Sequence, residues 1–138
     1  MHGYNSRHTM SWDVFIQHLP ASAVRVADVP DDFEPLPLGS QAEVLEAIRR
    51  VFPTVSTPEA TWAVVEDPHY RIEFGLGADD PITSIQLHVR GDETVVQGID
   101  QLIHALGARG IDSWTGEFFD PETARESVGR WNQFLEEL

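Results

Sequence analysis

Residues 70–106 constrain the fold more than any other part of the chain. Apolar and polar residues alternate over 70–74 and again over 82–90, as in strands with one buried face. Glycine and aspartate residues separate the two runs, and Gly91-Asp92 ends the second. The apolar spacing then becomes helical, with Val95, Ile99, Leu102 and Leu106 on one stripe. Adjacent periods of two and 3.6 residues predict two strands followed by a helix that packs on them.

The same periodicities predict the remaining elements. Strands are expected over 12–17, 61–66 and 111–114, and residues 57–59 are interpreted as a short turn. Ser40-Gln41-Ala42-Glu43 is a capping box that begins one helix, and Asp120-Pro121 begins another. The prediction is an α+β fold with a mostly antiparallel sheet of four to five strands and two to three helices packed largely on one face. We expect one core to contain Ile85, Leu87, Ile99, Leu102, Trp114 and Trp131.

Length and composition indicate the broad class of protein to which the chain belongs. The chain has 138 residues, which suits a single α+β domain over 11–138, preceded by a flexible N-terminal tail over 1–10 that lacks periodicity. No apolar run approaches the roughly 20 residues of a membrane helix, and no signal peptide is recognisable. Cysteine is absent, which excludes disulfides and thiolate metal sites. A cytoplasmic location is therefore the expectation.

The charge balance is strongly acidic. Twenty-three acidic residues face nine basic ones, all arginine, and the formal net charge is −14. Such a field repels nucleic acid and anionic membranes and attracts a basic protein. The alternative interpretation is that the charge serves solubility, or reflects the composition of a GC-rich or salt-adapted genome.

An acidic, proline-rich loop is the first candidate for partner binding. Residues 20–39 contain four prolines, which disfavour a helix there. A loop of this length is usually functional or packed along the surface. Its candidate partner-binding residues are Asp28, Asp31, Asp32 and Glu34. The alternative is a solvated connector.

The second candidate is the outward face of the two central strands. Alternation places Arg71 and Glu73 on one strand and His88 and Arg90 on the next, all pointing away from the core. A histidine beside a carboxylate can transfer protons, and an arginine can hold an anionic group. The candidate ligand-binding residues are Glu73, His88 and Arg90. The alternative is a solvated sheet face with cross-strand ion pairs.

Other sites are not predicted. The histidines at 18, 69, 88 and 104 lie on different elements and show no metal-ligand spacing. Gly75-Leu76-Gly77 lacks the helix of a phosphate loop and precedes Asp79-Asp80, which repel phosphate. Glycines do not flank any serine as in a nucleophile elbow. We therefore predict no catalytic residue, no metal and no cofactor.

Three segments carry a resemblance to a known family. They are Trp12-Asp13-Val14-Phe15-Ile16-Gln17, Leu87-His88-Val89-Arg90-Gly91 and Thr115-Gly116-Glu117-Phe118-Phe119. Together they resemble a family of small acidic bacterial proteins of unknown function, over residues 11–120. The resemblance implies a bacterial origin and a single α+β domain, and no activity. In size and charge the chain is also similar to toxin-immunity proteins.

These observations favour a non-enzymatic bacterial protein-interaction domain. The most specific version of this prediction is an immunity protein that neutralises a basic toxin. The competing prediction is a small hydrolase or ligand-binding domain that uses the polar sheet face around Glu73, His88 and Arg90.

Overall fold

The computed structural model describes residues 10–138, so the predicted N-terminal tail lies almost entirely outside the described residues. It confirms the α+β fold, with a six-stranded antiparallel sheet in the order β2-β3-β4-β5-β1-β6, against the four to five strands predicted. In chain order, the elements are β1 (Trp12–Gln17), η2 (Val26–Asp28), α1 (Gln41–Val51), β2 (Ser56–Glu59), β3 (Trp62–Asp67), β4 (Tyr70–Gly75), β5 (Ser84–Gly91), α2 (Val95–Ala105), β6 (Arg109–Asp112) and α3 (Pro121–Glu136).

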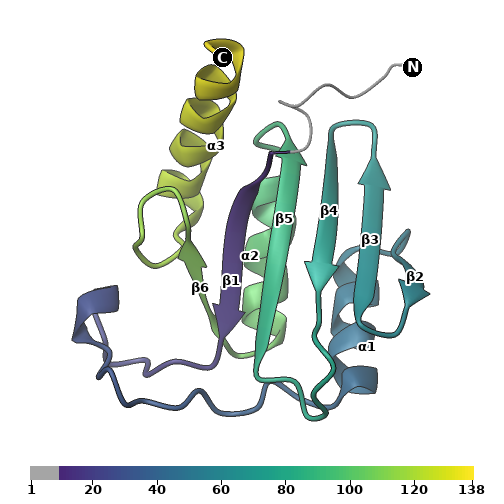
Figure 1. Ribbon diagram of the computed structural model, residues 1–138, viewed down its shortest axis with the longest axis vertical. Coiled ribbons are helices and arrows are strands. Elements are labelled where there is room, and N and C mark those ends of the chain that lie inside the picture. Colours follow the sequence, from purple (N-terminus) through teal and green to yellow (C-terminus); the bar gives the residue numbers. More distant parts are fainter. Residues whose placement is uncertain (1–9) are drawn as a thin grey trace.

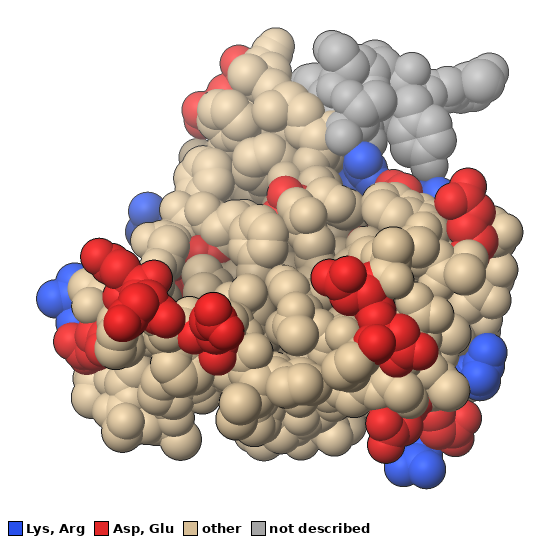
Figure 2. Space-filling view, turned by 60° about the horizontal axis from the view of Figure 1, so that its bottom comes forward, with Lys and Arg blue, Asp and Glu red and all other residues tan. Residues whose placement is uncertain are grey.

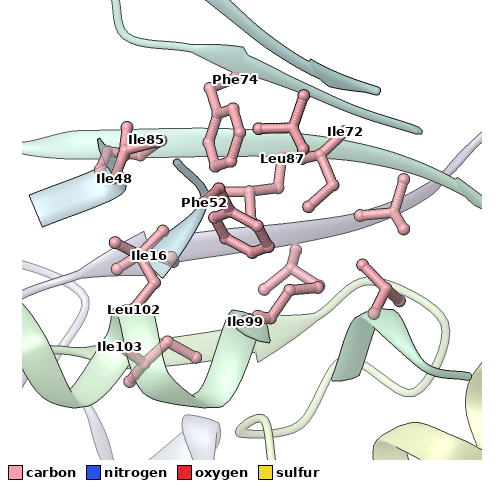
Figure 3. Packing of buried hydrophobic residues seen from close by; sticks show 14 of the residues in the cluster. Ile16, Ile48, Phe52, Ile72, Phe74, Ile85, Leu87, Ile99, Leu102 and Ile103 are labelled. Carbon is pink, nitrogen blue, oxygen red and sulfur yellow. The ribbon is translucent and has the colours of Figure 1, made fainter. Parts of the chain in front are cut away.

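The three α-helices lie on one face of the sheet (Figure 1). Strand alternation sends the apolar side chains of the central strands toward them, among them Ile16, Phe74 and Leu87, which are all fully buried. The helices return Ile48, Phe52, Ile99, Leu102 and Ile103 into the same layer (Figure 3). Among residues 10–138, no α-helix lies over the sheet's other face (Figure 1).

The sixth strand is β2, at the edge of the sheet, where the sequence predicts only a turn. All four of its residues are exposed, and the register shifts between Ser56 and Glu59. A strand that buries nothing shows no alternation, and Pro58 argues against a central strand. The pattern therefore contained no signal for it.

The prediction that Trp114 belongs to the core is wrong, because the last strand ends earlier than expected. β6 ends at Asp112, whose buried carboxylate accepts hydrogen bonds from the indole of Trp12 and the backbone amide of Trp114, both at 2.8 Å. These contacts turn the chain away from the sheet, and Trp114 is 41% exposed. It contacts Trp131 and Phe134 of α3 instead, at centroid distances of 5.8 and 5.9 Å.

The predicted capping box begins α1. The Ser40 hydroxyl accepts from the Glu43 amide at 3.1 Å, and the Glu43 carboxylate accepts from the Ser40 amide at 2.9 Å. The hydrogen bond from the Ser40 backbone, and then that from its side chain, lower the pKa of Glu43. Two of the otherwise unpaired groups at the helix start are thus satisfied.

Among residues 10–138, the longest helix is α3, and no helix has the length and apolar character that crossing a membrane requires.

Leu102 tests the position of the core. The Leu102→Ala variant should lose roughly 2–5 kcal/mol of unfolding free energy, because a fully buried leucine is truncated between α2 and the sheet. Urea denaturation measures this loss. The neighbouring Gln101 is exposed, and Gln101→Ala should change stability by less than about 0.5 kcal/mol. Equal effects of the two substitutions would contradict the assigned helix face.

Candidate functional site

The face of the sheet without helices is the first candidate site. We call it the open face and define it by the outward side chains of β3, β4, β5, β1 and β6. Its members are Trp62, Val64 and Glu66 on β3, Arg71, Glu73 and Gly75 on β4, Ser84, Gln86, His88 and Arg90 on β5, Asp13, Phe15 and Gln17 on β1, and Arg109 and Ile111 on β6. Glu73, His88 and Arg90 all lie on this face, as the alternation predicts.

Glu73 pairs with two arginines. Its carboxylate accepts a hydrogen bond from Arg90 at 2.7 Å and lies 3.7 Å from the Nε of Arg71. The two arginines stand directly opposite each other on β4 and β5, so their charges would repel without a carboxylate between them. Arg71 also contacts Glu66 on β3. The result is a row of alternating charges across three strands, with the side chains of Glu73, Arg71 and Arg90 about two-thirds or more buried.

His88 takes its carboxylate partner from a different strand than the sequence indicates. It stands opposite Glu73 on one side and Asp13 on the other. Its Nδ1 lies 3.1 Å from the carboxylate of Asp13, which also accepts a hydrogen bond from the Ser11 hydroxyl. Glu73 is engaged by the two arginines, and no hydrogen bond joins it to His88. The predicted trio therefore divides into a Glu73–Arg90 ion pair and a His88–Asp13 pair.

Trp62 completes the surroundings of His88. The two rings stack at a centroid distance of 5.9 Å and an interplanar angle of 29°. The indole reaches across Gly75, where an added Cβ would lie 3.5 Å from it. A Cβ at that distance would be in ordinary van der Waals contact with the indole. The stacking and the Asp13 contact together restrict the orientation of the imidazole.

The hydroxyl of Ser11 lies beside this Asp–His pair. An Asp–His pair can orient a proton carrier, and the Ser11 hydroxyl lies 3.5 Å from the same Nδ1 while it donates to Asp13. Arg90 also borders an open hollow of about 390 Å³ at the β3–β4 turn, together with Tyr70 and His69. Burial and the nearby carboxylate of Asp67 raise the pKa of Tyr70. Glu73 and His88 are not among the residues that line that hollow.

The second candidate site is the acidic loop, which we define as residues 20–34. Arg109 of β6 holds its start, donating to the carbonyls of Pro20 and Ala23 at 2.9 and 2.6 Å. The same guanidinium lies 3.5 Å from the ring centre of Phe118. Arg25 pairs with Glu117 at 3.6 Å, which ties the loop to the segment after β6. A loop anchored at these points is ordered before any partner binds.

The four acidic residues of this loop have different local roles. The carboxylate of Asp28 accepts from the Arg25 amide at 2.9 Å and so stabilises the single turn of η2. Asp31, Asp32 and Glu34 are exposed and form no ion pair or side-chain hydrogen bond with residues 10–138. Their charge is therefore uncompensated and faces solvent.

Metal binding has no support in the described part of the chain. Within residues 10–138, no three histidine, aspartate or glutamate side chains come together in a group that could hold a metal ion.

Sequence reasoning missed three side chains that shape these sites: Asp13, Trp62 and Arg109. Alternation does place Asp13 on the polar side of its strand, since Trp12 and Val14 are apolar. Its proximity to His88 depends on the pairing of β1 with β5, across some 70 residues of chain, which periodicity does not reveal. Arg109 had no signal, because its partners are backbone carbonyls of a distant loop.

The chain was compared with protein-family models, curated proteins and solved structures, and none of them matches it. The resemblance to the acidic bacterial family remains a prediction.

Glu73→Gln tests the role of the carboxylate between the two arginines. The variant should lose roughly 1–2 kcal/mol of stability at low salt, because Arg71 and Arg90 are then left facing each other in partly buried positions. Added salt should recover part of this loss by screening the repulsion. Thermal and urea denaturation at two salt concentrations measure both effects.

Glu66→Gln is the matched control, because its side chain is 70% exposed and pairs with Arg71 at the other end of the charge row. It should cost less than about 0.5 kcal/mol. A Glu73→Gln variant as stable as the wild type at low salt would show that the charge row contributes nothing to the fold.

Proposed function

We propose that this protein is a non-enzymatic interaction domain that binds a basic protein through its acidic loop. One observation carries the proposal: the loop is fixed by Arg109 and Arg25, while Asp31, Asp32 and Glu34 remain exposed and unpaired. A pre-ordered loop loses little conformational entropy on binding. Carboxylates that have no ion-pair partner among residues 10–138 are available to the cations of a partner.

The distribution of charge supports the same proposal. Figure 2 shows acidic side chains gathered over the loop that carries η2, at the left of the view, and in further groups across the same end of the molecule. In a chain with a formal net charge of −14, such an end attracts cationic surfaces over distances of up to about a Debye length. The expected effect of this field is faster association with a basic partner.

The most specific version of the proposal is that the chain is a bacterial immunity protein that neutralises a basic toxin. Its support is the size and charge of the chain and the resemblance described above. A small acidic protein can block a basic enzyme by covering its cationic substrate site, which requires surface complementarity and no chemistry of its own.

The His88–Asp13 pair supports a second candidate function, the binding of a small anionic ligand on the open face. His88, oriented by Asp13 and Trp62, lies beside the Glu73–Arg90 pair. A thermal-shift screen of small carboxylates and phosphates, repeated with His88→Ala, tests this function. Stabilisation of the wild type that the variant lacks would favour it over the interaction domain.

The acidic loop is tested by neutralising Asp31, Asp32 and Glu34 together as Asn, Asn and Gln. A basic protein captured by the wild type from native bacterial lysate should associate with this variant roughly three- to tenfold more slowly at about 0.05 M salt. The difference should shrink by about 0.5 M salt, because screening removes the steering. Biosensor kinetics measure the two rates.

A matched control neutralises three exposed carboxylates of α3 as Glu122→Gln, Glu126→Gln and Glu136→Gln. It changes the net charge by the same amount away from the loop and should slow association less. Repeated failure to capture any basic protein at low salt would count against the proposal and for a charge that serves solubility.

A further inference from the structure

The open face differs in charge from the rest of the molecule. Its carboxylates come from Asp13, Glu66 and Glu73, and its guanidinium groups come from Arg71, Arg90 and Arg109. Three charges of each sign cancel on these five strands, and Glu59 of edge strand β2, opposite Trp62, adds one negative charge beside them. Nearly all of the formal net charge of −14 therefore lies on other parts of the chain.

The charges of the open face are also largely matched within it. Glu73 binds Arg90 and approaches Arg71, and Arg71 contacts Glu66. The guanidinium of Arg109 lies over the Phe118 ring. Covering charges that are already paired and hydrogen-bonded costs less than burying isolated ones. The polar part of this face is thus suited to contact with another protein.

The remainder of the face is apolar and carries no helix. Trp62 and Val64 on β3, Phe15 on β1 and Ile111 on β6 are all partly exposed on the side away from the core. Phe15 and Trp62 lie on the same level of the sheet, with Gly75 and Gln86 between them. Such a row presents apolar surface across the width of the sheet, with the Trp62 indole over Gly75, and a second sheet can pack against it.

We propose that the open face binds a second copy of this chain, sheet against sheet. Two copies that approach through other surfaces meet strongly like-charged surfaces, whereas two open faces carry almost no net charge with which to repel each other. The alternating charge row offers each copy both signs of charge. Five strands about 4.8 Å apart and about six residues long present roughly 500 Å² per copy, below the roughly 800 Å² of a standard interface, so the dimer is weak.

Salt separates this interaction from the binding of a basic partner. Both copies carry the same net charge, so screening removes long-range repulsion and strengthens the dimer. The complex with a basic protein weakens under the same change. The dimer proposal does not rest on the proposed function, so an experiment can contradict either proposal without contradicting the other.

Two nearly isosteric substitutions test the face without threatening the fold. Gln17→Glu and Gln86→Glu together place two carboxylates on the open face, on β1 and β5. The matched control, Gln97→Glu with Gln101→Glu, makes the same chemical change on the exposed side of α2. Sedimentation equilibrium of the full chain at about 0.05 and 0.5 M salt, up to roughly 500 µM protein, measures self-association, because a weak interface needs high concentration.

The wild type should dimerise, more tightly at the higher salt. The face variant should dimerise at least tenfold more weakly, since each dimer would bury four added carboxylates, and those at position 86 have no arginine opposite them. The control should remain close to the wild type. Any of three results would overturn the proposal: a wild type that stays monomeric throughout, a dimer that dissociates on adding salt, or equal behaviour of the two variants. The open face would then bind a ligand or a different protein.

Discussion

The structure depends on burying one side of the sheet only. Side chains alternate along each strand, so one register decides both what enters the core and what remains outside. β5 is the clearest case, because it lies in the middle of the sheet between β4 and β1. A slip of one residue would expose Ile85, Leu87 and Val89 and drive Gln86 and His88 into the core. The buried apolar residues therefore determine the open face indirectly, because the residues that alternate with them must point away from the core.

The parts of the fold that bury apolar area were predictable from sequence. The period-two runs of β1, β4 and β5 and the helical stripe of α2 each match a buried face. The same alternation predicted that Glu73, His88 and Arg90 share the outward face. Edge strand β2 was not predictable, because it buries nothing. Trp114 was misplaced because a single buried carboxylate, Asp112, redirects the chain.

The sequence predicted which residues share the candidate site, but not which of their side chains pair with each other. Glu73 and His88 do stand opposite each other, yet their side chains bind other groups. The competition between Asp13, Arg71 and Arg90 for these two residues depends on which strands are neighbours. Strand order is a property of the whole chain, set by long-range packing and loop geometry, and no local pattern contains it.

The placement of the four tryptophans has a spectroscopic consequence. Trp12 is buried with its indole bonded to Asp112, and Trp114 and Trp131 contact each other beside Phe134. Trp62 alone among the four lies on the open face, stacked on His88. The emission of an indole depends on its surroundings, so the emission of Trp62 reports the covering of that face. The chain thus contains a natural optical probe on the surface whose occupant is in question, while the other three tryptophans record the integrity of the fold.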